Sequence, residues 1–319
     1  MIAPSAPSRP IATLTLNPAV DVSYEVSRLV SDQKSHATAT RTDPGGNGIN
    51  VGRALRVLGV LARNHCIMAG NAGILLERLL EDQIDAVFCE RVAGETRINA
   101  TILQADPPVQ YEVTGIGPFV PPEVLDRLLG DFLDHVAGGF GVLSGSVPPG
   151  VPSGIYGTMV RRVHDCGGQA IVDAHGDLLR ESLVHRPFLI KPNRYELSLL
   201  LGKEVPKIED VAAEARILVS QGVRYVCVSL GAEGALLSGS EGSFLAKPPP
   251  VIVKCTVGSG DSMVAGLIAA FSRGDSPGEA LRLAVACGSG TAAQPGTAIF
   301  TQSQLAELLP KTEVIPLDI

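Results

Sequence analysis

The chain has 319 residues, of which 45% are hydrophobic and 18% charged, and its formal net charge at pH 7 is −7. These proportions are typical of a globular protein and exclude a disordered chain. The negative charge argues against a general nucleic-acid surface, so local features would have to hold any anionic ligand. The six cysteines are scattered and include no Cys-x-x-Cys pair, which favours reduced thiols in a cytoplasmic protein.

Short apolar runs alternate with helical patterns along most of the chain. Residues 1–10 hold three prolines and are expected to form a flexible tail. Strands are expected at 11–16, 142–144, 170–173, 188–191 and 225–229, and helices at 123–136, 153–165 and 210–220. Apolar strands without polar alternation are buried on both faces, as in a parallel sheet covered by helices. The pattern therefore predicts an α/β protein, a three-layer α/β/α sandwich over residues 11–319.

Two segments, 22–43 and 88–112, depart from this alternation. Both contain alternating stretches rich in Thr, Val and Ile and lack a long helical pattern. Such half-exposed strands predict a small second sheet standing off the main one. Because the two segments are separated in the sequence, this sheet would form a discontinuous lid beside a ligand site.

Polar or glycine residues follow directly behind several of the predicted strands. Examples are Asp21, Ser146, Asp173, Lys191 and Ser229. In open parallel sheets, ligands bind just beyond the carboxyl ends of the strands. These ends together predict one shared crevice.

A glycine cluster at 45–48 leads into a helical pattern at 51–58. Its Gly-x-Gly spacing could belong to a dinucleotide-binding turn, but the residues before it are polar and end in Pro44, where that turn needs a buried strand. The interpretation that remains is that these glycines let the backbone approach a ligand closely. Asn50 could then offer a donor and an acceptor to sugar hydroxyls. Close packing of a helix against a strand is the alternative explanation.

Asn193 and Glu196 lie three residues apart at an expected helix start, and therefore on one helix face. Their amide and carboxylate could hold Mg²⁺ through its water shell. The same pair fits a capping box, which is the favoured interpretation when the pair is taken alone.

The segment 256–262, Thr-Val-Gly-Ser-Gly-Asp-Ser, places a glycine turn before an expected long helix. A helix N-terminus offers unpaired N–H groups and a partial positive charge, which suit a phosphate. Asp261 would then be a base acting on a hydroxyl beside the phosphate, or alternatively only a helix cap. Neither a Walker A loop nor the loop pair of protein kinases occurs, so any ATP chemistry needs a different scaffold.

The motifs at 45–51, 191–196 and 256–261 resemble, in order and spacing, the signatures of the PfkB (ribokinase-like) family of sugar kinases. The resemblance extends over about residues 11–309. Segments 13–21, 94–97, 144–150 and 173–176 resemble those of its phosphosugar kinases. The tail at 295–297, and the lack of lysine in the glycine cluster, are most similar to the 6-phosphofructokinase branch. The resemblance implies a ribokinase-like fold with a mostly parallel central sheet and a small β-sheet lid.

The resemblance also implies roles for individual residues. Asp261 would be the catalytic base, with backbone N–H groups of Gly258, Ser259 and Gly260 holding the transferring phosphoryl group. The substrate would be bound by Asp21, Lys34, Gly45, Gly46, Asn50, Arg97 and Ser146, with Lys34 and Arg97 on its phosphate. The nucleotide would be bound by Lys191, Asn193, Ser229, Gly231, Thr256, Gly258, Gly260 and Gly288. Asn193 and Glu196 would assist Mg²⁺ through water.

The implied reaction is ATP-dependent phosphorylation of the C1 hydroxyl of fructose 6-phosphate to fructose 1,6-bisphosphate, with Mg²⁺ and with K⁺ as a further cation. Fructose 1-phosphate and tagatose 6-phosphate are alternative acceptors. The resemblance further implies a homodimer formed through the lid. Two functions of another class stay open: a non-catalytic sugar-phosphate binding protein, and an esterase with Ser262 of a Gly-Asp-Ser block as nucleophile.

Overall fold

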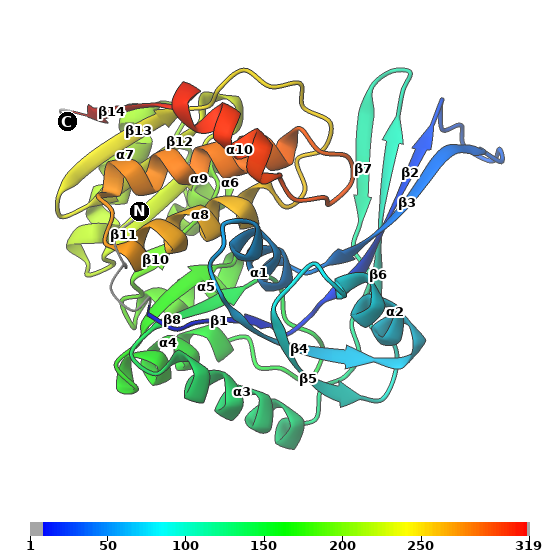
Figure 1. The fold of residues 1–319 in the computed structure, drawn as a ribbon, viewed down its shortest axis with the longest axis horizontal. Helices are drawn as coiled ribbons and strands as arrows, with labels where there is room; N and C mark the ends of the chain where they lie inside the picture. Colours follow the sequence, from blue (N-terminus) through cyan, green and yellow to red (C-terminus); the bar gives the residue numbers. More distant parts are fainter. Residues whose placement is uncertain (1–8, 318–319) are drawn as a thin grey trace.

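A ten-stranded sheet forms the centre of the molecule in the computed structural model, which describes residues 9–317 (Figure 1). Its strand order is β14-β13-β12-β11-β10-β9-β8-β1-β4-β5. The strands from β11 to β5 pair in parallel, and β12, β13 and β14 continue the sheet as antiparallel strands. The strands are β1 (Ile11–Thr15), β4 (Arg63–Ala69), β5 (Ala86–Val92), β8 (Phe140–Ser144), β9 (Gln169–Asp173), β10 (Leu189–Ile190), β11 (Tyr225–Ser229), β12 (Ala235–Gly239), β13 (Gly242–Lys247) and β14 (Glu313–Leu317).

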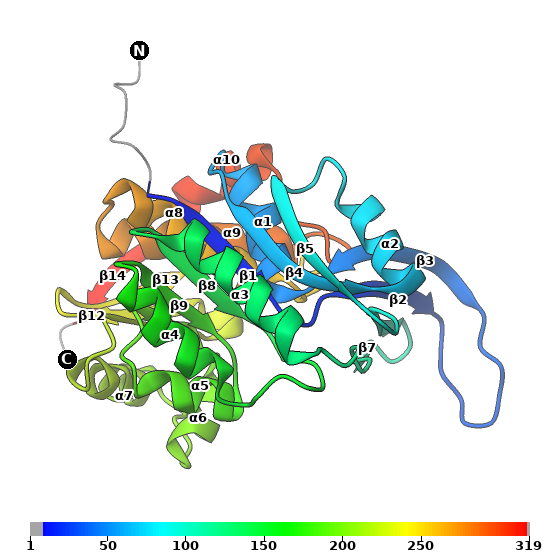
Figure 2. The ribbon, with the colours of Figure 1, turned by 90° about the horizontal axis from the view of Figure 1, so that it is seen from below.

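Helices cover both faces of this sheet (Figures 1 and 2). Helices α3 to α7 contribute to one buried apolar cluster, and α1, α8 and α9 contribute to another on the opposite face. Within β1, Leu14 belongs to the first cluster and Ile11 to the second, as expected for a strand buried on both faces. The helices are α1 (Asn47–Val57), α2 (Gly70–Leu80), α3 (Pro122–Val136), α4 (Ile155–Asp165), α5 (Gly176–Leu183), α6 (Arg194–Leu201), α7 (Ile208–Ser220), α8 (Ser259–Arg273), α9 (Pro277–Ala292) and α10 (Gln302–Leu308), with short 3₁₀ helices η1 (Gly231–Glu233) and η2 (Leu309–Lys311). The predicted three-layer α/β/α sandwich is confirmed.

A separate four-stranded sheet, the lid sheet, stands off the main body (Figure 1). Its order is β3-β2-β6-β7, with β2 (Ala19–Val26), β3 (Ala37–Gly45), β6 (Arg97–Gln104) and β7 (Val109–Val113). Strand β2 pairs in parallel with β6 and antiparallel with β3. The lid sheet is therefore built from two separate segments of the chain, as predicted.

The predicted lid boundary at residue 88 is wrong. Residues 88–92 belong to β5, the edge strand of the main sheet, where Cys89 pairs with Cys66 of β4 and the Phe88 ring stacks on His65. An edge strand is half exposed like a lid strand, so the residue pattern did not separate the two. The second lid segment begins at Arg97.

The expected tail at 1–10 lies largely outside the described residues. Its last residue, Pro10, is tied to the sheet, because its carbonyl accepts a hydrogen bond of 2.8 Å from the N–H of Phe140. Among the described residues, no helix combines the length and the apolar character that crossing a bilayer requires. All six cysteines are free thiols.

Candidate active site

A cavity of about 980 Å³ lies where the lid sheet meets the carboxyl ends of the parallel strands. Its walls come from strands β2 and β6 of the lid sheet, the start of α1, the ends of β9, β10 and β11, and helices α8 and α9. It brings together most of the predicted site residues. These are Asp21, Gly46, Asn50, Arg97, Lys191, Asn193, Glu196, Ser229, Gly231, Thr256, Gly258, Ser259, Gly260, Asp261 and Gly288.

Three predicted site residues do not line the cavity. Lys34 is exposed in the loop that joins β2 to β3. Figure 2 shows this loop extending away from the main body. Gly45 is buried behind Asp21, and Ser146 accepts a hydrogen bond of 3.1 Å from Asn17 Nδ2. Lys34 therefore does not lie in the cavity wall that contains Arg97. The sequence did not show how far the hairpin extends.

Helix α8 begins in the cavity wall with an anion-accepting turn. Gly258 precedes the helix with φ 80°, a left-handed conformation that glycine adopts without strain. No hydrogen bond among residues 9–317 uses the N–H groups of Gly258 and Gly260, whereas the N–H of Ser259 donates to the Thr256 carbonyl at 3.2 Å. The Ser259 hydroxyl is buried without a partner. Two of the three predicted amides are therefore free to meet a phosphate.

Asp261 lies in the first turn of α8 and is 5% exposed. The side-chain nitrogens of Asn47 and Asn50 donate to its two carboxylate oxygens, at 3.0 and 2.9 Å. Burial, followed by the charge of Asp173, raises the pKa of Asp261 to about 7, against the lowering effect of these donors and of Lys191. A carboxyl group with such a pKa can take up a proton near neutral pH.

This raised pKa predicts an acid limb in the activity of the free enzyme. A carboxylate serves as a base only when it is deprotonated, so activity should be present above the pKa and lost as pH falls through it. We expect kcat/KM to fall about tenfold per pH unit below about pH 7. A pH profile of kcat/KM measures this, and a profile flat down to pH 5 would contradict the assignment of Asp261 as the base.

A buried ion pair lies behind the turn of α8. Lys191 Nζ is 3.1 Å from Asp173 Oδ1, and both side chains are almost fully buried. Burial lowers the pKa of Lys191, but Asp173, Glu196 and Asp261 outweigh that effect and raise it to about 12. A Cβ placed on Gly260 would lie 3.0 Å from Lys191 Nζ, so the ammonium group sits against the turn. It is a fixed positive charge where a phosphate would arrive.

Asn193 and Glu196 form a capping box at the start of α6. Asn193 Oδ1 accepts from the Glu196 N–H, and Glu196 Oε2 accepts from the Asn193 N–H, both at 2.8 Å. The capping box that the sequence favoured for this pair is therefore present. Both residues also line the cavity, and Glu196 Oε1 makes no hydrogen bond within the described chain. Amide and carboxylate oxygens are ligands that suit Mg²⁺ held through water.

The lid side of the cavity carries a second set of polar groups. Asp21 Oδ1 accepts a hydrogen bond of 2.8 Å from Asn99 Nδ2, and burial raises the pKa of Asp21. Arg97 Nε donates to the Asn17 carbonyl at 3.0 Å, while no hydrogen bond in the described part of the chain uses its Nη atoms. Burial lowers the pKa of Arg97. This end can bind hydroxyls and an anion.

Gly45 is needed because Asp21 occupies the space beside it. A Cβ at Gly45 would collide with the Asp21 carboxylate. We expect Gly45→Ala to displace this carboxylate and raise the KM for the sugar roughly 10- to 100-fold, as for a lost hydrogen bond to a charged group, with the KM for ATP unchanged. Steady-state kinetics checks this against Gly130→Ala in α3, where nothing lies within 4 Å of the added Cβ. Equal sugar KM values for the two variants would contradict it.

Asn47, Asn99 and Asp173 line the cavity, although no catalytic or binding role was predicted for them. Asn47 lies inside the glycine cluster and Asp173 ends a predicted strand, so the sequence did carry signals for both. Asn99 had no such signal, because it reaches the site only through the pairing of β6 with β2.

Ser262 cannot serve as the nucleophile of an esterase in this fold. It is fully buried, and its hydroxyl forms a hydrogen bond of 2.7 Å with Thr291 Oγ1. A nucleophile needs an exposed oxygen beside a base. The Gly-Asp-Ser block is instead part of the α8 turn. Within residues 9–317 no group of His, Cys, Asp and Glu side chains is arranged to hold a metal ion directly.

The fold and the site define an ATP-dependent phosphotransferase with an alcohol acceptor, a sugar kinase of ribokinase-like architecture. The model of the pfkB family carbohydrate kinases matches residues 14–304, and the chain belongs to that family. It is 33% identical over 307 residues to a 1-phosphofructokinase of Bacillus subtilis, covering 95% of this chain and 99% of that one. It is also 33% identical over 312 residues to a 1-phosphofructokinase of Escherichia coli, covering 97% and 99%.

Solved structures show the same architecture. Phosphofructokinase-2 from Escherichia coli, in complex with substrates and products, superposes with a TM-score of 0.90 at 32% identity, covering 94% of this chain and 98% of that one. The same enzyme has been solved in complex with potassium and in a tetrameric inhibited form. These similarities confirm the predicted family and fold.

Proposed function

We propose that this protein transfers the γ-phosphoryl group of ATP to fructose 1-phosphate and forms fructose 1,6-bisphosphate. The observation that carries the kinase chemistry is the position of Asp261, buried beside the free N–H groups of Gly258 and Gly260 in one cavity with Arg97. The similarity to 1-phosphofructokinases over nearly the full length of both chains supports the choice of acceptor. This acceptor replaces fructose 6-phosphate, which the sequence motifs alone favoured.

In this proposal the acceptor hydroxyl of the sugar lies against Asp261. The carboxylate accepts the hydroxyl proton as the oxygen attacks the γ-phosphorus in line. The N–H groups of Gly258 and Gly260, with the Lys191 ammonium group behind them, stabilise the negative charge on the transferring group. These groups are already in place, so no reorganisation is needed at the moment of reaction.

The nucleotide would occupy the side of the cavity formed by α8, α9 and the end of β11. Ser229, Gly231, Thr256 and Gly288 line that side. A Cβ at Gly288 would lie 2.7 Å from Met263 Cγ, so glycine keeps α9 close to α8 there. Mg²⁺, held through water by Asn193 and Glu196, would neutralise charge on the phosphates.

The sugar and its phosphate would occupy the lid side. Asp21 and Asn50 would bind ring hydroxyls, and the unbonded Nη atoms of Arg97 would bind the phosphate. In the furanose form of fructose, C1 and C6 are both exocyclic CH₂ groups, and C1 is attached to the anomeric carbon. Each of these two groups is called an arm here. The two fructose monophosphates therefore present a phosphate on one arm and a free hydroxyl on the other, and differ in which arm reaches Asp261.

Fructose 6-phosphate is the second candidate acceptor, because phosphofructokinase-2 from Escherichia coli, at 31% identity to this chain, has been solved in complex with fructose-6-phosphate. A coupled ADP-release assay with fructose 1-phosphate, fructose 6-phosphate, tagatose 6-phosphate and free fructose separates the candidates. We expect kcat/KM for fructose 1-phosphate to exceed the other values at least about tenfold. A reversed order would make fructose 6-phosphate the substrate, and no ADP release with any sugar would overturn the proposed function.

We also propose a homodimer formed through the lid sheet and activation by K⁺. Ile98 and Val113 on the lid sheet are 54% and 62% exposed, and a partner that covered them would bury apolar surface. The potassium complex and the tetrameric form of the Escherichia coli enzyme support both parts. Analytical ultracentrifugation, and assays in K⁺ against Na⁺ buffer, test them.

A further inference from the structure

Arg53 in α1 is a buried cation that the proposed mechanism does not use. Its side chain is 4% exposed, it does not line the cavity, and no carboxylate in the described residues lies within ion-pair distance of it. Burial lowers its pKa to about 10, so the guanidinium stays charged at neutral pH. A buried charge without a direct counter-ion is costly, and here hydrogen bonds and the more distant carboxylates of Asp43 and Asp21 offset that cost.

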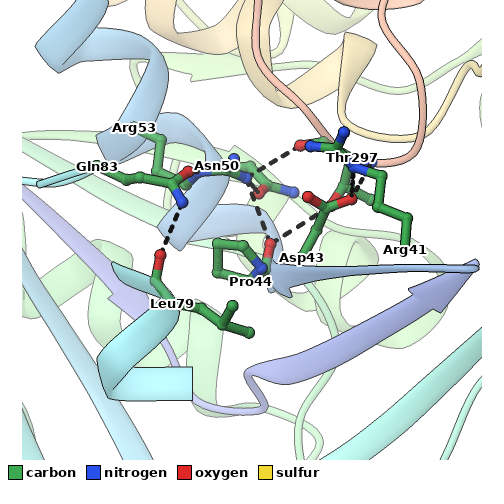
Figure 3. A network of polar contacts seen from close by, with 8 residues as sticks. All are labelled: Arg41, Asp43, Pro44, Asn50, Arg53, Leu79, Gln83 and Thr297. Atoms are coloured by element: carbon green, nitrogen blue, oxygen red, sulfur yellow. Dashed lines mark hydrogen bonds and ion pairs between the residues drawn. The ribbon is translucent and has the colours of Figure 1, made fainter. Parts of the chain in front are cut away.

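Uncharged oxygens from three separate elements hold the guanidinium in place (Figure 3). Nη1 donates to the Thr297 carbonyl at 3.0 Å and to the Pro44 carbonyl, in lid strand β3, at 3.3 Å. Nε and Nη2 both donate to Gln83 Oε1, at 3.1 and 2.8 Å. Asp43 fixes the same corner, because its Oδ2 accepts from the Thr297 N–H. The planar guanidinium is therefore held in one orientation by the end of lid strand β3, the loop after α9 and the loop after α2.

The remaining hydrogen bond of the Arg53 guanidinium connects it to the active site through Asn50. Arg53 Nη1 donates to Asn50 Oδ1 at 3.0 Å, and Asn50 Nδ2 donates to Asp261 Oδ2 at 2.9 Å. An amide rotated by 180° would place its oxygen against the carboxylate of Asp261 and its N–H₂ against the guanidinium. Because arginine can only donate, it stabilises one of these two orientations and penalises the other.

We propose that Arg53 is a positioning residue for phosphoryl transfer, which fixes the Asn50 amide with its nitrogen toward Asp261. This inference rests on the proposed role of Asp261 as the base. The charged groups that surround this chain of contacts are Asp173 and Lys191 on the side of Asp261, and Asp21, Arg41 and Asp43 on the side of Arg53. Without Arg53, Asp261 loses both an ordered donor and a nearby positive charge, and both losses favour its protonated form.

Arg53→Met tests the inference. We expect kcat to fall about 10- to 100-fold through misplacement of the base, the KM for ATP to stay unchanged, and the acid limb of kcat/KM to move upward by about one pH unit. A purely structural role would lower the melting temperature and leave the acid limb in place, and that result would overturn the inference. Arg56→Met is the matched control: it makes the same change on the same helix, at a half-exposed arginine that pairs with Asp85 and does not contact Asn50, and it should not move the limb.

If Arg53→Met does not fold, Arg53→Gln tests whether Arg53 is a positioning residue. Glutamine keeps one donor for Asn50 but carries no charge, so the acid limb should still move upward, by less than in Arg53→Met. An unmoved limb in a folded Arg53→Gln would overturn the inference. Asp261→Asn, assayed in parallel, separates the two proposals: if it retains turnover, the role of Asp261 has failed. If it abolishes turnover while the Arg53 variants keep the wild-type limb, only the role of Arg53 has failed.

Discussion

Replacing Asp261 with asparagine is expected to lower kcat by at least about 10²- to 10⁴-fold, the range that a positioned general base contributes. Asparagine has nearly the same shape but cannot accept the hydroxyl proton. The amides of Gly258 and Gly260, which we propose bind phosphate, are backbone groups and remain, so ATP should bind as before. Steady-state turnover and calorimetric titration with ATP measure the two effects separately.

The stability of the same variant provides a check on its fold. The pKa of Asp261 is raised in the folded state, so its contribution to stability is present at low pH and lost as pH rises through about 7. Asparagine stays uncharged, and the variant should therefore melt no lower than the wild type at pH 8. Asp134→Asn, on the exposed surface of α3, is a control that should leave turnover unchanged. Near-normal turnover of Asp261→Asn would remove this residue from the role of base.

Replacing Lys191 with methionine is expected to lower the free energy of unfolding by roughly 3–5 kcal/mol. The substitution leaves the buried carboxylate of Asp173 without its partner at 3.1 Å. Urea denaturation followed by circular dichroism measures the loss.

Two comparisons test this cause of the instability. Lys203→Met makes the same change at an exposed lysine, which pairs with the partly buried Glu214, and should cost at most about 1 kcal/mol. Adding Asp173→Asn to Lys191→Met removes the unpaired charge and should recover part of the lost stability. If the two lysine variants lose similar amounts of unfolding free energy, burial of the Lys191–Asp173 pair is not the cause of the instability.

The sequence predicted those features that local residue patterns determine. The α8 turn is an example, because glycines directly before an apolar stretch permit the positive φ that the chain adopts at Gly258. Strand β11 lies at 225–229, as expected from its unbroken apolar run between polar residues. Such features need no knowledge of distant parts of the chain.

Features that depend on pairing between distant segments were missed. The antiparallel strands β12, β13 and β14, which extend the mostly parallel main sheet, were not among the strands predicted from apolar runs. Strand β5 was assigned to the lid, because half exposure is common to lid strands and sheet edges. Asn99 and Arg53 likewise come into place only when β6 pairs with β2 and when lid strand β3 and two loops meet at one guanidinium.

The central position of β1 has a consequence for how the chain acquires its structure during synthesis. Ala12 of β1 pairs with Arg63 of β4 on one side and with Gly141 of β8 on the other. Strand β1 must therefore wait until residues 140–144 of β8 have been synthesised before its second neighbour exists. Helix α8, which brings Asp261, emerges later still. Contacts between such distant segments form slowly, so we expect nascent chains to depend on protection from aggregation until most of the sheet has been made.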